Sequence, residues 1–377
     1  MTISFVITTY NVAPYVEQCL SSVAEIAEAG DQVIIVDDGS DDGTVELIAA
    51  FADANSFAQG VEFSPIYLGS NTMGGVGIGA NIGLQEATRE TVFFVDGDDW
   101  IDPDGFRRAR TRWTFSSCDI LIANYLEFDQ TKSVTKVSAD HNRWHSLVHG
   151  DSPELNREQA LRMIAVPWRK FYRRALLSDH NLRFPEGDFF FEDNPFHWAV
   201  CLAARTISFI DVTICYHRIN RPGQTMASKG DELAAFFVHF QTIRSSLPPG
   251  NADLEVMAAQ WLLNNVSWHL TRVAPAARYA YAGAAAAAFQ LIDSKVWNDR
   301  LAPMERTKRV WAFADRLRAG DIGGVIDGWQ RDDLESEVKR LRKELTAVRR
   351  QVDRVHKSAL AISARHRFES LQSLQQK

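Results

Sequence analysis

The sequence predicts an α/β fold in which a doubly wound, mostly parallel sheet carries helices on both faces. Short apolar runs alternate with segments of helical periodicity through the first 100 residues. Polar clusters follow three of the apolar runs, at residues 8–11, 37–44 and 96–99. Since ligands bind beyond the carboxyl ends of the strands in such sheets, we expect the three clusters to form one shared site.

The expected elements of this sheet follow a regular order along the chain. Strands are expected at residues 3–8, 32–36, 61–68 and 91–95, and helices at 12–29, 45–54 and about 80–90. Glycine-rich residues 74–83 lead into the third helix. Their spacing differs from that of a dinucleotide-binding fingerprint and no strand directly precedes them, so we expect a flexible loop over a ligand.

The fourth strand ends in a cluster of carboxylates. Thr91–Val95 is apolar or β-branched throughout, which is typical of a strand buried on both faces, and Asp96, Gly97, Asp98 and Asp99 follow it. Such carboxylates repel one another and lose hydration unless a cation or hydrogen-bond donors hold them. Oxygen ligands two residues apart suit Mg²⁺ or Mn²⁺, whose coordination substrate phosphates commonly complete. The alternative is a solvated acidic turn that caps a helix.

A second pair of carboxylates lies in the mixed region that follows. Further strands are expected at 118–124, 131–137 and 207–216, with a helix at 153–165. Glu192 and Asp193 lie between three phenylalanines and Phe196. Carboxylates among apolar neighbours tend to titrate abnormally or to be paired, which marks both as functional candidates. The alternative is that Asp193 caps a helix beginning near Pro195.

The C-terminal part is expected to be helical from 231 to 319, with a linker at 320–328. Nine apolar residues from Leu334 to Ile362 then recur alternately four and three residues apart, which predicts a coiled coil and a parallel homo-oligomer, either a dimer or a trimer. Leu334 can be assigned to either the a or the d position, so the number of chains stays open. The alternative is that the stripe packs on its own chain through the linker.

The net charge, the cysteine content and the length of the apolar runs indicate which partners and which cellular compartment to expect. The net charge of −7 gives no reason to expect nucleic-acid binding. Four cysteines without paired spacing fit reduced thiols, and we expect a cytoplasmic protein without a signal peptide. No apolar run approaches the ~20 residues of a membrane span. The tail at 331–377 holds 12 Lys and Arg against 7 Asp and Glu. A coiled-coil exterior explains these charges, and peripheral association with anionic lipid at the inner face of a membrane is the alternative.

Seven short motifs in their order along the chain resemble the family 2 glycosyltransferases of the GT-A fold. The resemblance covers roughly residues 1–228. The motifs are Ile7–Asn11, Val36–Ser40, Gly79–Leu84, Phe94–Asp99, Trp168–Tyr172, Glu192–Asp193 and Tyr216–Arg218. The chain departs from the family at Gly79-Ala80-Asn81, where the family often has an arginine in the middle position, and any role of that arginine is therefore in doubt here.

The resemblance implies an inverting, metal-dependent transfer from a nucleotide-sugar donor, a UDP-sugar, to a hydroxyl of a glycan or glycoconjugate. It implies Mn²⁺ or Mg²⁺ as the cofactor, and synthesis of a surface polysaccharide, capsule or lipopolysaccharide as the setting. The resemblance also implies roles for single residues. Asp38 would hydrogen-bond the edge of uracil, with Thr8 and Tyr10 on either side of the base, Asp96 would lie near the ribose or sugar, and Asp98 would bind the metal. Arg218 would face the pyrophosphate, and Asp193 would be the general base, with Glu192 beside it helping to place the donor or acceptor.

The expected organisation is a transferase domain at 1–228, a helical region and linker at 229–328, and a coiled-coil helix at 329–377. Two other functions are alternatives to sugar transfer. A sugar nucleotidyltransferase would carry a glycine-rich, basic loop after the first strand, where this chain has Thr8–Val12 without Gly or Lys. A non-catalytic scaffold with a degenerate transferase domain is disfavoured by the intact Asp38, Asp98 and Asp193.

Overall fold

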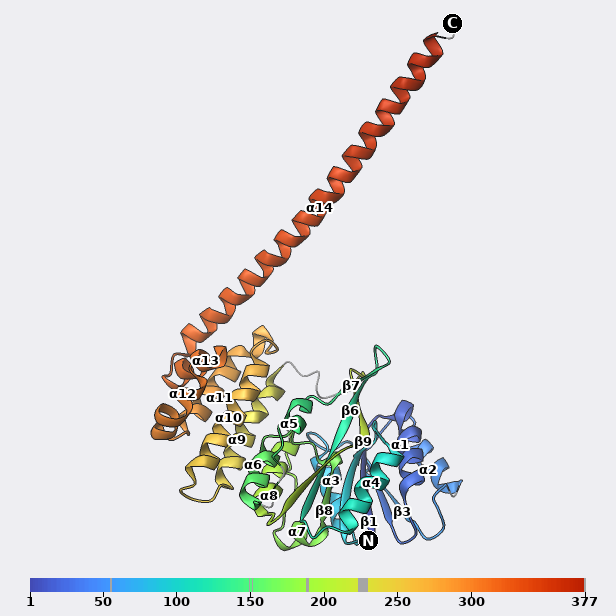
Figure 1. The fold of residues 1–377 in the computed structure, drawn as a ribbon, viewed down its shortest axis with the longest axis vertical. Helices are drawn as coiled ribbons and strands as arrows, with labels where there is room; N and C mark the ends of the chain where they lie inside the picture. The colour runs from blue at the N-terminus through green and yellow to red at the C-terminus, as the bar shows by residue number, and fades with distance from the viewer. Residues whose placement is uncertain (55, 149, 151, 188–189, 223–229, 376–377) are drawn as a thin grey trace.

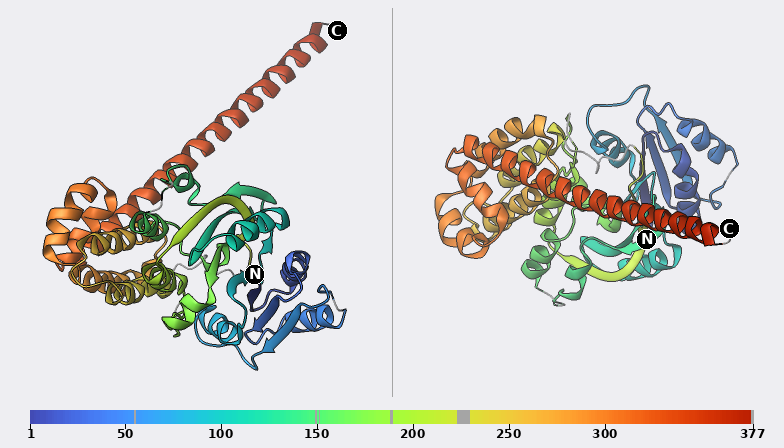
Figure 2. Two further views of the ribbon diagram at one scale, coloured as in Figure 1. Left: turned by 60° about the horizontal axis from the view of Figure 1, so that its bottom comes forward. Right: turned by 90° about the horizontal axis from the view of Figure 1, so that it is seen from above.

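The computed structural model describes residues 1–377 except 55, 149, 151, 188–189, 223–229 and 376–377. An α/β body and a helical region lie side by side, and one long helix projects away from both (Figure 1). Figure 2 shows the same arrangement from two further sides.

One mixed sheet forms the centre of the α/β body and confirms the predicted fold class. Its strand order is β3-β2-β1-β4-β8-β6-β9-β5, with β7 attached to β6. The strands are β1 (Ile3–Thr9), β2 (Gln32–Asp37), β3 (Glu62–Tyr67), β4 (Thr91–Asp96), β5 (Trp100–Ile101), β6 (Ile120–Asp129), β7 (Val134–Val137), β8 (Lys170–Arg173) and β9 (Ile207–Ile219). The first four strands are mutually parallel, as the alternation of apolar and helical segments predicted.

Helices cover both faces of the parallel strands. The helices α1 (Ala13–Ile26) and α4 (Pro103–Thr114) cover one face, where Phe5 and Phe93 meet Phe106. The helix α3 (Gly77–Glu86) packs on β1 and β2 from the other face. The helix α2 (Thr44–Asp53) lies beside α1. The strand β3 is half-exposed at the edge of the sheet, which tolerates Pro65 because an edge strand needs no donor there.

The remaining helices extend the core of the second face. They are α5 (His141–His145), α6 (Pro153–Leu161), α7 (Arg174–Asp179), α8 (Asp193–Ala203), α9 (Ala235–Ser245), α10 (Ala252–His269), α11 (Arg278–Gln290), α12 (Ala302–Glu305) and α13 (Arg309–Arg318). One apolar cluster runs from Val6 and Phe94 in the sheet through Phe240 of α9 to Leu317 of α13. The helical region therefore shares a core with the α/β body.

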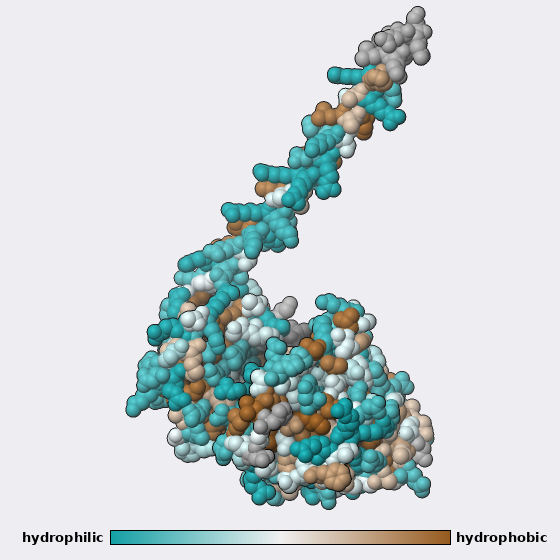
Figure 3. Space-filling view, in the orientation of Figure 1, coloured by the Kyte–Doolittle hydropathy of each residue, from teal (hydrophilic) through white to brown (hydrophobic). Residues whose placement is uncertain are grey.

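The last helix, α14 (Ile322–Gln375), begins inside the stretch that was expected to be a linker. That prediction is wrong for residues 322–328, because packing outweighs the helix penalty of the glycines. Val325 and Trp329 are buried, and Trp329 Nε1 donates to the carbonyl oxygen of Leu270. Every side chain from 330 to 370 is exposed, so the apolar stripe does not pack on its own chain. Apolar patches alternate with hydrophilic ones along this helix in Figure 3.

Among the described helices, none combines the length and the apolar character needed to cross a membrane.

Candidate active site

The sheet register brings the three polar clusters of the N-terminal half to one edge. Thr8 lies opposite Asp96 of β4, and Thr9 lies opposite Asp37 of β2. The backbone then links the turns that follow, since Asp38 N donates to Thr9 O at 2.9 Å and Gly97 N donates to Thr8 O at 2.9 Å. The shared edge that the sequence predicted is therefore present.

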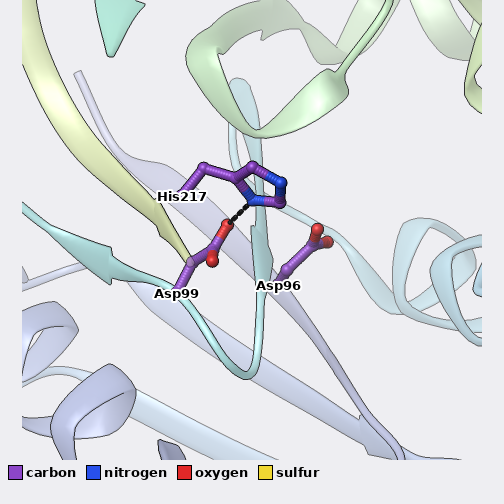
Figure 4. Close-up of side chains that lie close together, drawn as sticks. All are labelled: Asp96, Asp99 and His217. Atoms are coloured by element: carbon purple, nitrogen blue, oxygen red, sulfur yellow. Dashed lines mark hydrogen bonds and ion pairs between the residues drawn. The ribbon is translucent and has the colours of Figure 1, made fainter. Parts of the chain in front are cut away.

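A compact group of titratable side chains lies just beyond β4. Ligand atoms of Asp96, Asp99 and His217 lie within 4.8 Å of one another, and Figure 4 shows the two carboxylates and the imidazole converging. His217 Nδ1 and Asp99 Oδ2 are 2.9 Å apart. Burial raises the pKa of Asp96 well above its usual range, and the Asp99 and Asp98 carboxylates raise it further.

His217 is the cationic member of this group. Burial alone would lower the pKa of His217, but the carboxylates of Asp99, Asp98 and Asp96, with Asp99 the strongest of them, together outweigh burial and raise the pKa to about 9. The ring is held in place by Trp168, on which it stacks with centroids 4.9 Å apart. Trp168 belongs to one of the seven motifs, and β9 supplies His217, so two distant motifs meet at the carboxylates.

Two arginines bind the acidic turn from β9 and the residues after it. Asp98, which the resemblance assigns to the metal, forms an ion pair with Arg221. Arg218 is buried, and its side chain donates to Asp98 O at 2.8 Å, to Gln130 Oε1 at 2.5 Å and to Gln18 Oε1 at 2.8 Å. Arg218 thus ties β9 to the turn. Arg221 contacts the Asp98 carboxylate, whereas Arg218 contacts the backbone carbonyl oxygen of Asp98.

Asp193 is the first residue of α8, and its side chain does not cap that helix. The residue is half-buried, and its enclosed Oδ1 atom has no hydrogen-bond partner in the part of the chain that the structure describes. Burial raises the pKa of Asp193 to about 7; Glu192 adds to the rise, and Lys170 opposes it. An enclosed carboxylate without a partner, with a pKa near neutrality, has the properties of a general base.

Glu192 binds the glycine-rich loop. Its Oε1 accepts a hydrogen bond from Gly77 N at 2.8 Å, and burial raises its pKa. A Cβ on Gly75 would lie 2.5 Å from the same oxygen, so a side chain at this position would displace the Glu192 carboxylate. The helix expected from about residue 80 begins at Gly77 instead, three residues earlier, where Glu192 binds the backbone.

Asp38 binds the other end of the same loop. Its carboxylate accepts from Thr72 N at 2.9 Å, from Thr72 Oγ1 at 2.9 Å and from Asn71 Nδ2 at 3.1 Å. Tyr10 is 47% exposed, and Thr8 is half-buried in β1. The segment from Asn71 to Gly77 therefore spans from Asp38 to Glu192.

Sequence reasoning missed three charged residues of the site: Lys170, His217 and Arg221. Lys170 is fully buried, its Nζ donates to Ala165 O and Val166 O, and burial lowers its pKa to about 7. Lys170 and His217 stand inside recognised motifs, which could have marked them, but their spacing gives no sign that Lys170 lies near Asp193 or that His217 contacts Asp99. Arg221 lies outside every motif.

Residues 4–180 match the model of the family described as glycosyl transferase family 2. EpsH of Bacillus subtilis is 28% identical over 224 residues, which are 58% of this chain and 61% of that protein. The poly(ribitol-phosphate) beta-N-acetylglucosaminyltransferase TarS of Staphylococcus aureus is 27% identical over 257 residues, 68% of this chain and 42% of TarS. The chain spans less than two thirds of the length of either relative.

The fold is shared with a solved structure over most of the chain. A crystal structure of S. aureus TarS 1–349 in complex with UDP-GlcNAc superposes with a TM-score of 0.67 at 22% identity, covering 88% of this chain and 92% of that one. The likeness thus reaches past residue 228 into the helical region. The family match over residues 4–180, the order of the motifs and the common GT-A fold agree, and together they support a family 2 glycosyltransferase.

Proposed function

We propose that the protein transfers a sugar from a UDP-sugar to a hydroxyl of a glycan or glycoconjugate, with inversion at the anomeric carbon. The observation that carries the proposal is the unpartnered, enclosed Oδ1 of Asp193 near the carboxylates of β4. The two sets are close enough for Asp193 to raise the pKa of Asp96. A proton acceptor beside a donor-binding acidic turn is the arrangement that glycosyl transfer requires.

Asp193 is the proposed general base. A sugar hydroxyl is a poor nucleophile until a positioned carboxylate takes its proton, and a base works best when its pKa lies near the working pH. The pKa of about 7 satisfies that condition. The activated hydroxyl attacks the anomeric carbon from the face opposite to UDP. UDP then leaves, and the configuration of the anomeric carbon is inverted. Glu192 serves this step by raising the pKa of Asp193 and by holding the loop at Gly77.

Asp38, Thr8 and Tyr10 are the proposed nucleobase site. Asp38 offers carboxylate oxygens at the strand edge, and the exposed ring of Tyr10 lies one residue beyond β1. The hydrogen bonds from Asn71 and Thr72 show that Asp38 accepts N–H and O–H donors in this position. The N–H on the edge of uracil is a donor of the same kind.

The acidic turn fits a divalent cation, Mn²⁺ or Mg²⁺. The observation behind this fit is the crowding of Asp96, Asp98 and Asp99, whose mutual repulsion a cation relieves. Asp98 remains the proposed ligand, and Asp96 and Asp99 lie where they can join it. When bound, such a cation neutralises the leaving diphosphate. Arg221, already paired with Asp98, would lie beside that diphosphate, and Arg218 would keep the turn in place.

The acceptor is proposed to be a bacterial-type surface glycan, in a capsule, a lipopolysaccharide or another surface polysaccharide. The similarity to TarS, a poly(ribitol-phosphate) beta-N-acetylglucosaminyltransferase, supports a polymeric acceptor. We propose a cytoplasmic enzyme that can associate peripherally with the inner face of the membrane. We further propose that residues 1–228 form the transferase domain and that α14 assembles the chain into a dimer or trimer through its exposed apolar stripe.

The test is release of UDP from a panel of UDP-sugars by the full chain with Mn²⁺, compared with the variant Asp193→Asn. Release by the unaltered chain and its loss in the variant would support the proposal. Equal release by both would remove Asp193 from the mechanism. No release from any nucleotide sugar, with glycan acceptors present, would contradict transferase activity.

A further inference from the structure

We propose that α14 pairs in parallel and in register with α14 of a second copy of this chain, and that Glu337 and Glu344 select this arrangement by contacting Arg342 and Arg349 of the second copy. The inference rests on the self-association proposed above and specifies its geometry. It is carried by the exposed apolar stripe and by the charges beside it.

The stripe defines the heptad positions. In a heptad the step from a to d is three residues and the step from d to a is four. Leu334 is followed by Val338, four residues later, and of the two assignments considered from the sequence only Leu334 at d fits this step, so Val338 occupies a. These two side chains are 67% and 46% exposed, and the apolar positions that follow are exposed as well. An apolar stripe of this length in water requires a covering surface.

The residues beside the stripe carry opposite charges on its two sides. Glu337 and Glu344 occupy g positions, and Arg342 and Arg349 occupy e positions. In a parallel, in-register pair, each g residue faces the e residue of the next heptad on the other helix. Glu337 then faces Arg342 of the second copy, and Glu344 faces Arg349. By symmetry each contact forms twice.

An antiparallel pair has less of this complementarity. When the two stripes overlap fully in opposite directions, e faces e and g faces g. Arg349 would then face Arg349 of the second copy and Glu344 would face Ser358, so that Glu337 facing Arg365 is the opposite-charge contact that remains. Like charges in these positions disfavour the pairing. The charges therefore select the parallel arrangement, with both α/β bodies at the same end of the coil.

The side chains are free to form these contacts. Glu337 and Glu344 pair within their own helix with Arg340, at 2.5 and 2.6 Å. Exposed pairs of this type are weak, and a carboxylate can accept from a second guanidinium. No ion pair in the described part of the chain involves Arg342 or Arg349.

The test uses a single cysteine in the full chain, Leu341→Cys at a d position. The four native cysteines are buried, so mild oxidation reports on the new thiol. A parallel, in-register pair brings the two thiols together, and most of the variant should become a covalent dimer. An antiparallel pair would place residue 341 opposite residue 359 and separate the thiols by about 27 Å at 1.5 Å per residue, too far for a disulfide. Lys343→Cys, on the outer f position, is the matched control.

Light scattering on the same samples distinguishes self-association itself from the parallel register of the two helices. A dimer in which Leu341→Cys forms no more covalent product than Lys343→Cys would overturn the parallel register and leave self-association standing. A monomer would overturn both.

The charge contacts are tested by Arg342→Glu with Arg349→Glu, which should weaken association about tenfold. Adding Glu337→Arg and Glu344→Arg should restore it, and an unchanged affinity in the first variant would contradict the assigned contacts.

Discussion

Glu192 Oε1 accepts a hydrogen bond of 2.8 Å from Gly77 N. Because Glu192 directly precedes Asp193, this bond joins the glycine-rich loop to the start of α8. The chain separation of 115 residues between the two partners makes this contact a product of the fold alone. The loop is held at its other end by Asp38, which accepts from Thr72. A change at either end is therefore expected to affect the proposed base and the proposed nucleobase site together.

The first prediction concerns the close approach of Gly75 to Glu192. In Gly75→Ala the new methyl group would lie 2.5 Å from Glu192 Oε1, so the carboxylate or the loop must move. We expect kcat/KM for UDP release to fall by about tenfold or more, because small displacements of catalytic groups are costly. Gly69→Ala is the control, since a Cβ there meets nothing within 4 Å. Equal activity of both variants would show that the contact does not position the site.

The second prediction concerns stability against pH. Burial raises the pKa of Asp193 from 3.8 to about 7, so the folded state holds this proton more tightly than the unfolded state does. The contribution of Asp193 to the free energy of unfolding therefore falls as the pH rises from about 4 to about 7. Asp193→Asn removes that dependence. Thermal melts should show the variant gaining stability relative to the unaltered chain between pH 5 and pH 8, and a constant difference would contradict the raised pKa.

The third prediction concerns the acidic turn. Asp98→Ala should abolish the Mn²⁺-dependent part of UDP binding measured by calorimetry, because it removes the proposed ligand and leaves Arg221 without its carboxylate. Asp104→Ala is a suitable control, since that side chain is 96% exposed and lies outside the site. If Asp98→Ala keeps the metal-dependent affinity for UDP, Asp98 is not the ligand, and Asp96, Asp99 and His217 become the candidates.

The fourth prediction concerns the tail. Leu341→Asp together with Val348→Asp places charges in the apolar stripe and should make the full chain monomeric by light scattering. UDP release should stay unchanged, because both residues are exposed on the part of α14 that projects from the body (Figure 1). A loss of activity together with assembly would instead show that the active site depends on the second copy.

The sequence predicted the parallel strands and their polar ends because short, unbroken apolar runs that end in polar residues are typical of strands buried on both faces of a sheet. It did not predict that His217 meets Asp99 or that Lys170 lies near Asp193, because these contacts join residues far apart in the chain, 118 positions in the first case. The prediction of a linker at 320–328 is wrong because α14 begins at Ile322, and Val325 and the adjacent Trp329 pack against the helical region. Glycine content indicates weak helix propensity, and tertiary packing overrode it there.

The proposed role of Asp193 as the acceptor of the proton of the attacking hydroxyl is tested most directly by comparing UDP-sugar binding with turnover in Asp193→Asn. The substitution preserves the shape of the side chain and removes the proton acceptor. We expect UDP affinity to remain within about twofold, because the residue does not belong to the proposed nucleobase or metal site, while turnover falls by about 10²–10⁴. Turnover that remains at the level of the unaltered chain would contradict the assignment of Asp193 as the base.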